Sequence, residues 1–178
     1  SETPEKKYSL PDSDGLPLNE SLKAVAFTNR YIEKHHGQEG IFATLFFGIL
    51  NTETGNLHYI NAGHEPLVLL APSGTFQTIP PTAPAVGIMP DSRFRVEVTS
   101  VLPGQILFGY TDGVTDAYSA KAGRYGRERL VASLREAAAT PEDFLQHVEN
   151  DIYRHMAECE LADDIAMITL RRLSNFPQ

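Results

Sequence analysis

The chain has 178 residues, of which 42% are hydrophobic and 21% charged, a composition that suits one folded domain or a large part of one. Its net charge of −8 argues against nucleic-acid binding and against attachment to a membrane surface through basic residues. The single cysteine excludes a disulfide framework, and the lack of a signal peptide or of an apolar run of about 18 residues predicts a cytoplasmic protein without membrane insertion.

The first part of the chain is predicted to hold a tail and one helix. Residues 1–18 are rich in proline and charge and have no apolar period, which is typical of a tail or linker. The folded domain is expected over residues 19–173, with a short C-terminal tail at 174–178. A helix is predicted from Asn19, a favourable N-cap, to Gly37, a natural stop.

The middle of the chain is predicted to be a series of strands. Four apolar segments joined by turn residues indicate an antiparallel meander, with strands at 42–50, 57–61, 67–71 and 75–79. Alternating apolar and charged residues predict a half-buried strand at 94–98, and a further strand is expected at 105–110.

Two helices and a last strand complete the prediction. The first helix is expected at 127–138, and the second begins at Thr140-Pro141, where threonine caps and proline takes the first helical position. Residues 165–170 form the last strand. A run of strands followed by helices indicates an α+β layered fold.

Carboxylates at two strand ends are the main functional signal. Asp112 follows the strand at 105–110, with Gly113 beside it, and Asp163-Asp164 precedes the last strand. Carboxylates and backbone carbonyls are ligands for Mg²⁺ and Mn²⁺, and glycine leaves room for an ion. These residues therefore predict a divalent-metal hydrolase, although two positions are too few for a binuclear site.

Each of these signals has a structural alternative. Asp-Gly is the commonest hairpin signal, so spacing alone favours a turn at Asp112-Gly113, but the residues that follow do not resemble a returning strand. Asp163-Asp164 could be a solvated loop or a cap. For His64, a hydrogen bond that fixes a turn is a better explanation than metal binding.

Six short motifs occur in a defined order along the chain. They are Phe42-Ala43-Thr44-Leu45, Asn61-Ala62-Gly63-His64-Glu65-Pro66, Leu102-Pro103-Gly104-Gln105, Tyr110-Thr111-Asp112-Gly113-Val114-Thr115-Asp116, Tyr125-Gly126 and Asp163-Asp164-Ile165. Any one of these motifs is a weak indication of a family, but six of them in this order are a specific indication. Over roughly residues 19 to 172 the chain resembles the C-terminal two-thirds of the SpoIIE-like (stage II sporulation protein E) phosphatases, members of the metal-dependent protein phosphatase 2C-like superfamily.

The resemblance implies a fold, an activity and partners. The implied fold is an α-β-β-α sandwich of antiparallel sheets flanked by helices, here incomplete at its N-terminus. The implied activity is a protein serine/threonine phosphatase with two Mn²⁺ or Mg²⁺ ions, acting in bacterial signalling on a phosphorylated anti-sigma factor antagonist. Asp112 and Asp163 match metal ligands, with Asp164 and Gly113 as weaker candidates. A sensor or receiver domain is expected upstream in the parent protein.

The chain also departs from this family pattern. Nothing matches the family's early Gly-Asp-Val-Ser-Gly-Lys-Gly-like segment, which supplies further metal ligands. Ser13-Asp14-Gly15 is only superficially similar to it. Ala166 stands where the family usually has threonine. The chain alone is therefore expected to bind metal weakly and to have little activity, and its open sheet edges could favour a homodimer.

Two alternatives to an active phosphatase remain. The chain could be a catalytically inactive regulatory binding module of the same fold. It could also be a metal-dependent hydrolase of another fold, in which Asp112 and Asp163 would lie far apart.

Overall fold

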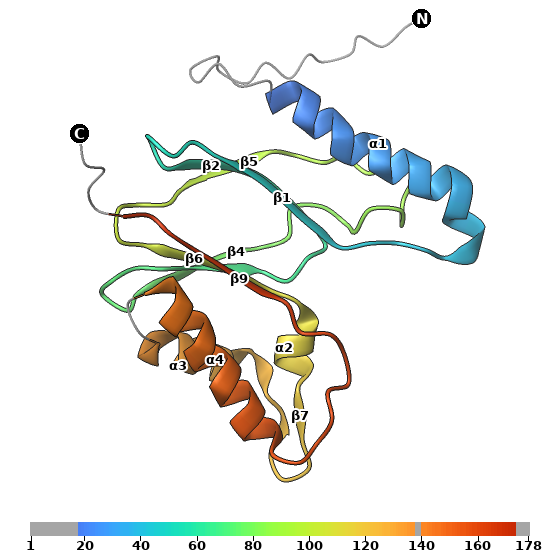
Figure 1. The fold of residues 1–178 in the computed structure, drawn as a ribbon. Helices are drawn as coiled ribbons and strands as arrows, with labels where there is room; N and C mark the ends of the chain where they lie inside the picture. Colours follow the sequence, from blue (N-terminus) through green and yellow to red (C-terminus); the bar gives the residue numbers. More distant parts are fainter. Residues whose placement is uncertain (1–17, 138–139, 174–178) are drawn as a thin grey trace, which may run out of the picture.

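The computed structural model describes residues 18–137 and 140–173, so residues 1–17 of the expected N-terminal tail and the expected tail at 174–178 lie outside the described residues. Leu18, the last residue of the expected N-terminal tail, belongs to the first helix. Four layers follow one another in Figure 1: helix α1, two β-sheets, and a layer of helices that contains α3 and α4. This arrangement confirms the α-β-β-α sandwich. No helix in the described part of the chain is both long and apolar enough to cross a membrane.

Both sheets are antiparallel. The first has the order β1-β2-β5, and its strands are β1 (Leu45–Leu50), β2 (Asn56–Ala62) and β5 (Glu97–Ser100). The second has the order β4-β3-β6-β9, and its strands are β3 (Leu67–Leu70), β4 (Phe76–Ile79), β6 (Ile106–Tyr110) and β9 (Met167–Arg171).

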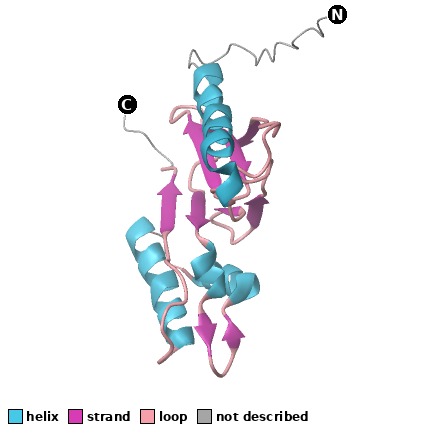
Figure 2. Ribbon diagram, turned by 90° about the vertical axis from the view of Figure 1, so that its right-hand side faces the viewer, coloured by secondary structure: helices cyan, strands magenta, loops and turns pink. Residues whose placement is uncertain are grey.

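The helices lie at the two ends of the layered structure. Figure 2 shows α1 at one end and a small hairpin at the other. The helical segments are α1 (Leu18–His36), the short 3₁₀ helix η1 (Gly37–Glu39), α2 (Asp112–Asp116), α3 (Gly126–Glu136) and α4 (Pro141–Met156), and the hairpin strands are β7 (Tyr118–Ser119) and β8 (Gly123–Arg124).

Three apolar clusters fill the spaces between the layers. Val25 of α1 packs on Ile60 of the first sheet, Leu57 and Leu69 lie between the sheets, and Phe108 packs against Phe144 of α4. Burial of these side chains is the main source of stability, at roughly 1.5–3 kcal/mol for each large apolar side chain.

The continuous meander expected from the sequence is wrong, because its four strands divide between the two sheets. β1 and β2 form a hairpin in the first sheet, whereas β3 and β4 form a hairpin in the second. The chain crosses between the sheets just after Ala62, where Gly63 takes a positive φ of 70°. A side chain at Gly63 would also crowd Ala85.

Several predicted boundaries also move. α1 already includes Leu18, so Asn19 is not its N-cap, whereas Thr140 does cap α4 by accepting a hydrogen bond from the amide of Asp143 at 3.2 Å. The strand predicted at 94–98 is found at Glu97–Ser100. Phe94 and Val96 precede it, packed against the cluster beneath α1, which explains their alternating pattern.

Candidate metal centre

The two carboxylate segments lie side by side at one edge of the second sheet. β6 and β9 pair antiparallel as far as Tyr110 and Met167. The pairing continues one step beyond the strands, where the amide of Thr111 donates to the carbonyl of Ala166 at 3.0 Å. Because neighbouring antiparallel strands end together, the residues that follow β6 and those that precede β9 share one edge of the sheet.

Thr111 joins these segments through its side chain. Its hydroxyl donates to the carbonyl oxygen of Asp164 at 3.0 Å and accepts from the amide of Ala166 at 2.9 Å. These two bonds replace the regular ladder, so β9 begins at Met167 and not at residue 165 as predicted. Sequence reasoning does not reveal this role of Thr111, because it depends on a partner 53 residues away.

Gly113 allows the segments to approach closely. It is buried in the first turn of α2, and a Cβ atom built there would clash with the carbonyl oxygen of Asp164 and lie 3.4 Å from that of Asp163. No larger residue fits without moving this backbone. Gly113 as a metal ligand therefore stays a prediction, and what the structure adds is the need for a glycine at this contact.

Asp112 begins a helix, so the hairpin-turn alternative is wrong. α2 runs from Asp112 to Asp116, and Asp112 is exposed at its start. One of its carboxylate oxygens accepts a hydrogen bond from the amide of Gly113 at 3.0 Å. Asp163 is also exposed and accepts in the same way from the amide of Asp164 at 2.8 Å. Within the described residues, the second oxygen of each carboxylate makes no hydrogen bond.

The chemistry of this edge suits a hard cation. Two exposed carboxylates, each with one oxygen held by the backbone and the other open, fit the preference of Mg²⁺ and Mn²⁺ for oxygen ligands and water. Asp112 and Asp163 as metal ligands stay a prediction with which this chemistry is consistent. The described residues contain no cluster of three or more His, Cys, Asp or Glu side chains that could hold a metal. They supply only part of a coordination shell.

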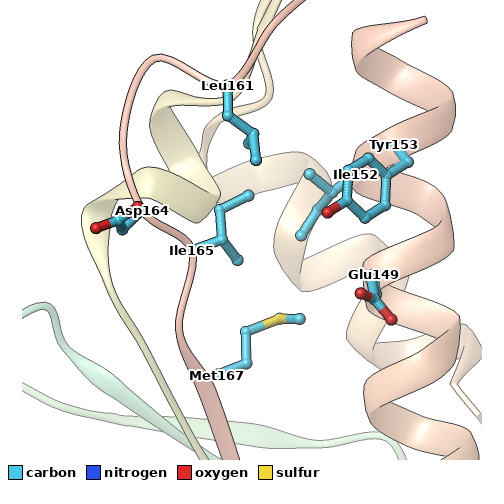
Figure 3. Close-up of a pocket in the computed structure, with 7 residues that line it drawn as sticks. All are labelled: Glu149, Ile152, Tyr153, Leu161, Asp164, Ile165 and Met167. Carbon is cyan, nitrogen blue, oxygen red and sulfur yellow. The ribbon is translucent and has the colours of Figure 1, made fainter.

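A pocket of about 340 Å³ lies next to this edge, between α4 and the segment that leads into β9 (Figure 3). Ile165 and Met167 point into it, whereas the carboxylate of Asp164 points away from it. The lining residues are Glu149, Ile152, Tyr153, Leu161, Asp164, Ile165 and Met167. The pocket is therefore a neighbour of the carboxylate edge and not part of it.

A network of polar side chains supports the hairpin beyond α2. Asp151 of α4 accepts from the hydroxyl of Tyr125 at 2.7 Å and from Arg129 of α3 at 3.2 Å. Another guanidinium nitrogen of Arg129 donates to Nδ1 of His155 at 2.9 Å, and Nε2 of His155 donates to the carbonyl of Gly123 at 3.0 Å. The network ties α3, α4 and β8 together.

The same network shifts the pKa values of Tyr125 and Asp151 in opposite directions. Burial raises the pKa of the Tyr125 hydroxyl above its ordinary value, and the hydrogen bond to Asp151 raises it further. For Asp151, burial by itself would raise the pKa, but the hydrogen bonds from Arg129 and Tyr125 outweigh burial, and the pKa lies below its ordinary value.

The histidine singled out in the sequence does fix a turn. The amide of His64 donates to the side-chain oxygen of Asn61 at 2.9 Å, and Nδ1 of its ring lies 3.0 Å from the carbonyl oxygen of Glu65. The predicted hydrogen-bonding role of His64 is therefore confirmed.

Comparisons with known proteins agree with this architecture. The domain has the protein phosphatase 2C-like fold: it matches the SiaA-PP2C domain of Pseudomonas aeruginosa with a TM-score of 0.71 at 19% identity, covering 86% of this chain and 65% of that one. It also matches the phosphatase domain of SpoIIE from Bacillus subtilis, presoaked with Mn, with a TM-score of 0.65 at 13% identity, covering 93% and 70%.

The sequence comparisons define the family. Residues 13–173 match the model of Stage II sporulation protein E (SpoIIE), and the chain belongs to this family. It is 42% identical over 168 residues to Protein IcfG of Synechocystis sp., covering 93% of this chain and 26% of that protein. It is 24% identical over 166 residues to Phosphoserine phosphatase RsbU of Bacillus subtilis, covering 92% and 48%. The chain thus spans a quarter to a half of these relatives.

Proposed function

We propose that the chain is the larger part of a metal-dependent protein serine/threonine phosphatase domain that acts in bacterial signalling. One observation carries the proposal: in a chain of the SpoIIE family, Thr111 and Gly113 hold the segments of Asp112 and Asp163-Asp164 in contact at one sheet edge. The contact argues against the alternative hydrolase of another fold, which would place Asp112 and Asp163 far apart.

Each residue of the edge has a separate task in this proposal. Asp112 and Asp163 hold Mn²⁺ or Mg²⁺ through their open carboxylate oxygens, and Asp164 and Gly113 are weaker candidates for the same task. A bound ion would supply a Lewis acid and an activated water for hydrolysis of the phosphate ester. Thr111 positions the Asp164 backbone through its two hydrogen bonds, and further ligands come from water or from chain outside the described residues.

The proposed substrate is a phosphorylated anti-sigma factor antagonist in the cytoplasm, with a sensor or receiver domain upstream of the phosphatase. The similarity to a protein named phosphoserine phosphatase supports the chemical class of the substrate. A net charge of −8 is compatible with an acidic domain that recruits divalent cations.

The test is phosphate release from a phosphoserine-containing anti-sigma factor antagonist by the natural full-length protein. We expect activity that needs Mn²⁺ or Mg²⁺, and a loss of about 10- to 100-fold in metal affinity or activity for Asp112→Asn and for Asp163→Asn. Asp91→Asn, at an exposed loop aspartate, is the control and should retain activity. Binding of the phosphoprotein without any phosphate release would instead identify a regulatory binding module.

A further inference from the structure

The pocket between α4 and the segment that leads into β9 opens to the surface. Its volume is about 340 Å³, which is room for one long side chain (Figure 3). Ile152, one of its lining residues, is only 1% exposed, whereas Tyr153 and Leu161 are 51% and 43% exposed. The pocket therefore reaches from the apolar interior to solvent, and a side chain of another molecule can enter it.

The pocket and the carboxylate edge are built from consecutive residues. The carbonyl oxygen of Asp164 accepts from the Thr111 hydroxyl at 3.0 Å, and Asp164 also lines the pocket. The next residue, Ile165, points into the pocket, while the Asp164 carboxylate points away from it (Figure 3). A protein that brings a phosphate group to this edge therefore has further residues within reach of the pocket.

The charge around the pocket is negative. Glu149 is half-buried in its wall, and within the described residues it forms no ion pair. Residues 157–167, which lead from α4 to β9, contain four Asp or Glu and no Lys, Arg or His. Arg154 of α4 lies 3.6 Å from Asp151 and is paired there. The pocket therefore favours a cationic occupant.

The other lining residues specify the shape of that cation. Ile165 and Met167 provide apolar contacts for an aliphatic stem. The ring of Tyr153 offers an exposed aromatic face, on which a cation is favourable. A purely apolar occupant would cover the Glu149 carboxylate without giving it a partner, which costs free energy. Lysine and arginine combine the stem with the charge.

We propose that this pocket receives a lysine or arginine side chain of the phosphorylated anti-sigma factor antagonist and so selects the substrate. The proposal rests on the proposed phosphatase function. The stem of the basic side chain packs on Ile165 and Met167, and its charge lies at Glu149. The contact is made away from the reacting phosphate, so it stabilises the bound substrate and the transition state equally. Its loss therefore raises KM and leaves kcat unchanged.

The first test is Glu149→Gln in the natural full-length protein. Glutamine removes the charge and can still accept from the side chain of Gln146, as Glu149 does at 3.0 Å. On the phosphoserine-containing antagonist we expect KM to rise about 5-fold at low salt, with a smaller difference at high salt and the same kcat. The KM for p-nitrophenyl phosphate should not change, because this substrate has no side chain to fill the pocket. An unchanged KM for the phosphoprotein would overturn the proposal.

A matched control is available on the neighbouring helix. Glu136 is exposed on α3 and does not line the pocket, and Glu136→Gln changes the net charge by the same amount. This variant should keep the natural KM for the phosphoprotein. An equal rise in KM for both variants would mean that only net charge matters, and the pocket would lose its assigned role.

The basic residue of the antagonist is found by substitution of each of its lysines and arginines by methionine, which keeps an aliphatic stem. At one position we expect a rise of about 5-fold in KM with the natural protein and no further rise with Glu149→Gln, because the two changes remove the same contact. If the effects of every position add to that of Glu149→Gln, the antagonist does not place a cation at Glu149.

A binding measurement separates this proposal from the phosphatase function. In calorimetric titrations of the full-length protein without Mn²⁺ or Mg²⁺, Glu149→Gln should raise the Kd of the antagonist about 5-fold, whether or not the antagonist is phosphorylated. If this shift occurs without any hydrolysis, the phosphatase function fails and the pocket assignment stands. If hydrolysis occurs while Kd and KM stay unchanged, the pocket assignment alone fails. A change in oligomeric state of the variant in light scattering, with no change in Kd, would assign the pocket to a second copy of the chain instead.

Discussion

The hydroxyl of Thr111 donates to the carbonyl of Asp164 at 3.0 Å, across 53 residues of sequence. The same oxygen accepts from the amide of Ala166, so one side chain fixes both the position and the direction of the segment that carries Asp163 and Asp164. The candidate metal centre therefore depends on a residue that is not itself expected to bind the ion.

Thr111→Val keeps the shape of the side chain and removes both hydrogen bonds. We expect a loss of about 1–3 kcal/mol in the free energy of unfolding and a weakening of Mn²⁺ binding of about 10-fold, because the segment of Asp163 is no longer held. Urea unfolding and isothermal titration calorimetry measure the two effects. Thr111→Ser keeps the hydroxyl and should retain both properties; unchanged metal affinity in the valine variant would contradict the positioning role.

Gly113→Ala introduces a methyl group against the Asp164 carbonyl. The backbone must shift to admit it, at a cost of about 1–3 kcal/mol typical of overpacking, and the two carboxylate segments should separate. Thermal unfolding and Mn²⁺ titration report these changes. Gly37→Ala is the control, since a Cβ there meets no neighbour closer than 3.9 Å. Normal stability of the Gly113 variant would mean that the segments are not in contact in solution.

The supporting network predicts an acid-dependent part of the stability. Because the pKa of Asp151 is lowered in the folded protein, its contribution is present above the unfolded pKa of about 3.9 and is lost as the pH falls through the folded value. Asp151→Asn should reduce the free energy of unfolding at pH 7 by about 1–3 kcal/mol, since Arg129 and Tyr125 lose a charged partner. It should also flatten the pH dependence below pH 4. Urea titrations at several pH values test both effects. If the free energy of unfolding of the variant depends on pH below pH 4 as steeply as that of the natural protein, Asp151 is not the origin of this pH dependence.

Arg172 leads to a contrasting prediction, because it stabilises the contact between the two sheets and does not touch the candidate metal centre. Its guanidinium donates to the backbone carbonyls of Glu53, Thr54 and Val101, and so ties the end of β9 to the first sheet. Arg172→Met should lower the free energy of unfolding by about 1–3 kcal/mol and leave Mn²⁺ affinity unchanged. Calorimetry of the folded variant separates the two properties. A loss of metal affinity equal to that of the Thr111 variant would show that metal binding merely follows stability.

The sequence predicted individual elements better than their arrangement. Thr140 could be recognised as a cap because its partner, Asp143, is three residues away. The division of the strands between two sheets could not, since the turn after Ala62 has the same local composition whether β3 joins β2 or crosses to another sheet. For the site, the positions of Asp112 and Asp163 beside strands predict metal ligands, but the contact between their two segments depends on a hydrogen bond from Thr111 to Asp164, 53 residues away.

The last prediction concerns self-association. Within the described residues, β9 pairs only with β6, and Ile168 on β9 is 69% exposed. An apolar residue on an unpaired edge favours pairing with another chain. We expect residues 1–178 alone to form dimers in light scattering, and Ile168→Lys to shift them to monomers because a charge would be buried at the new contact. Val98→Lys, at a residue 53% exposed on β5, tests whether a charge at another edge has the same effect. A monomer at every concentration, or equal dissociation by both lysines, would exclude β9 as the site of pairing.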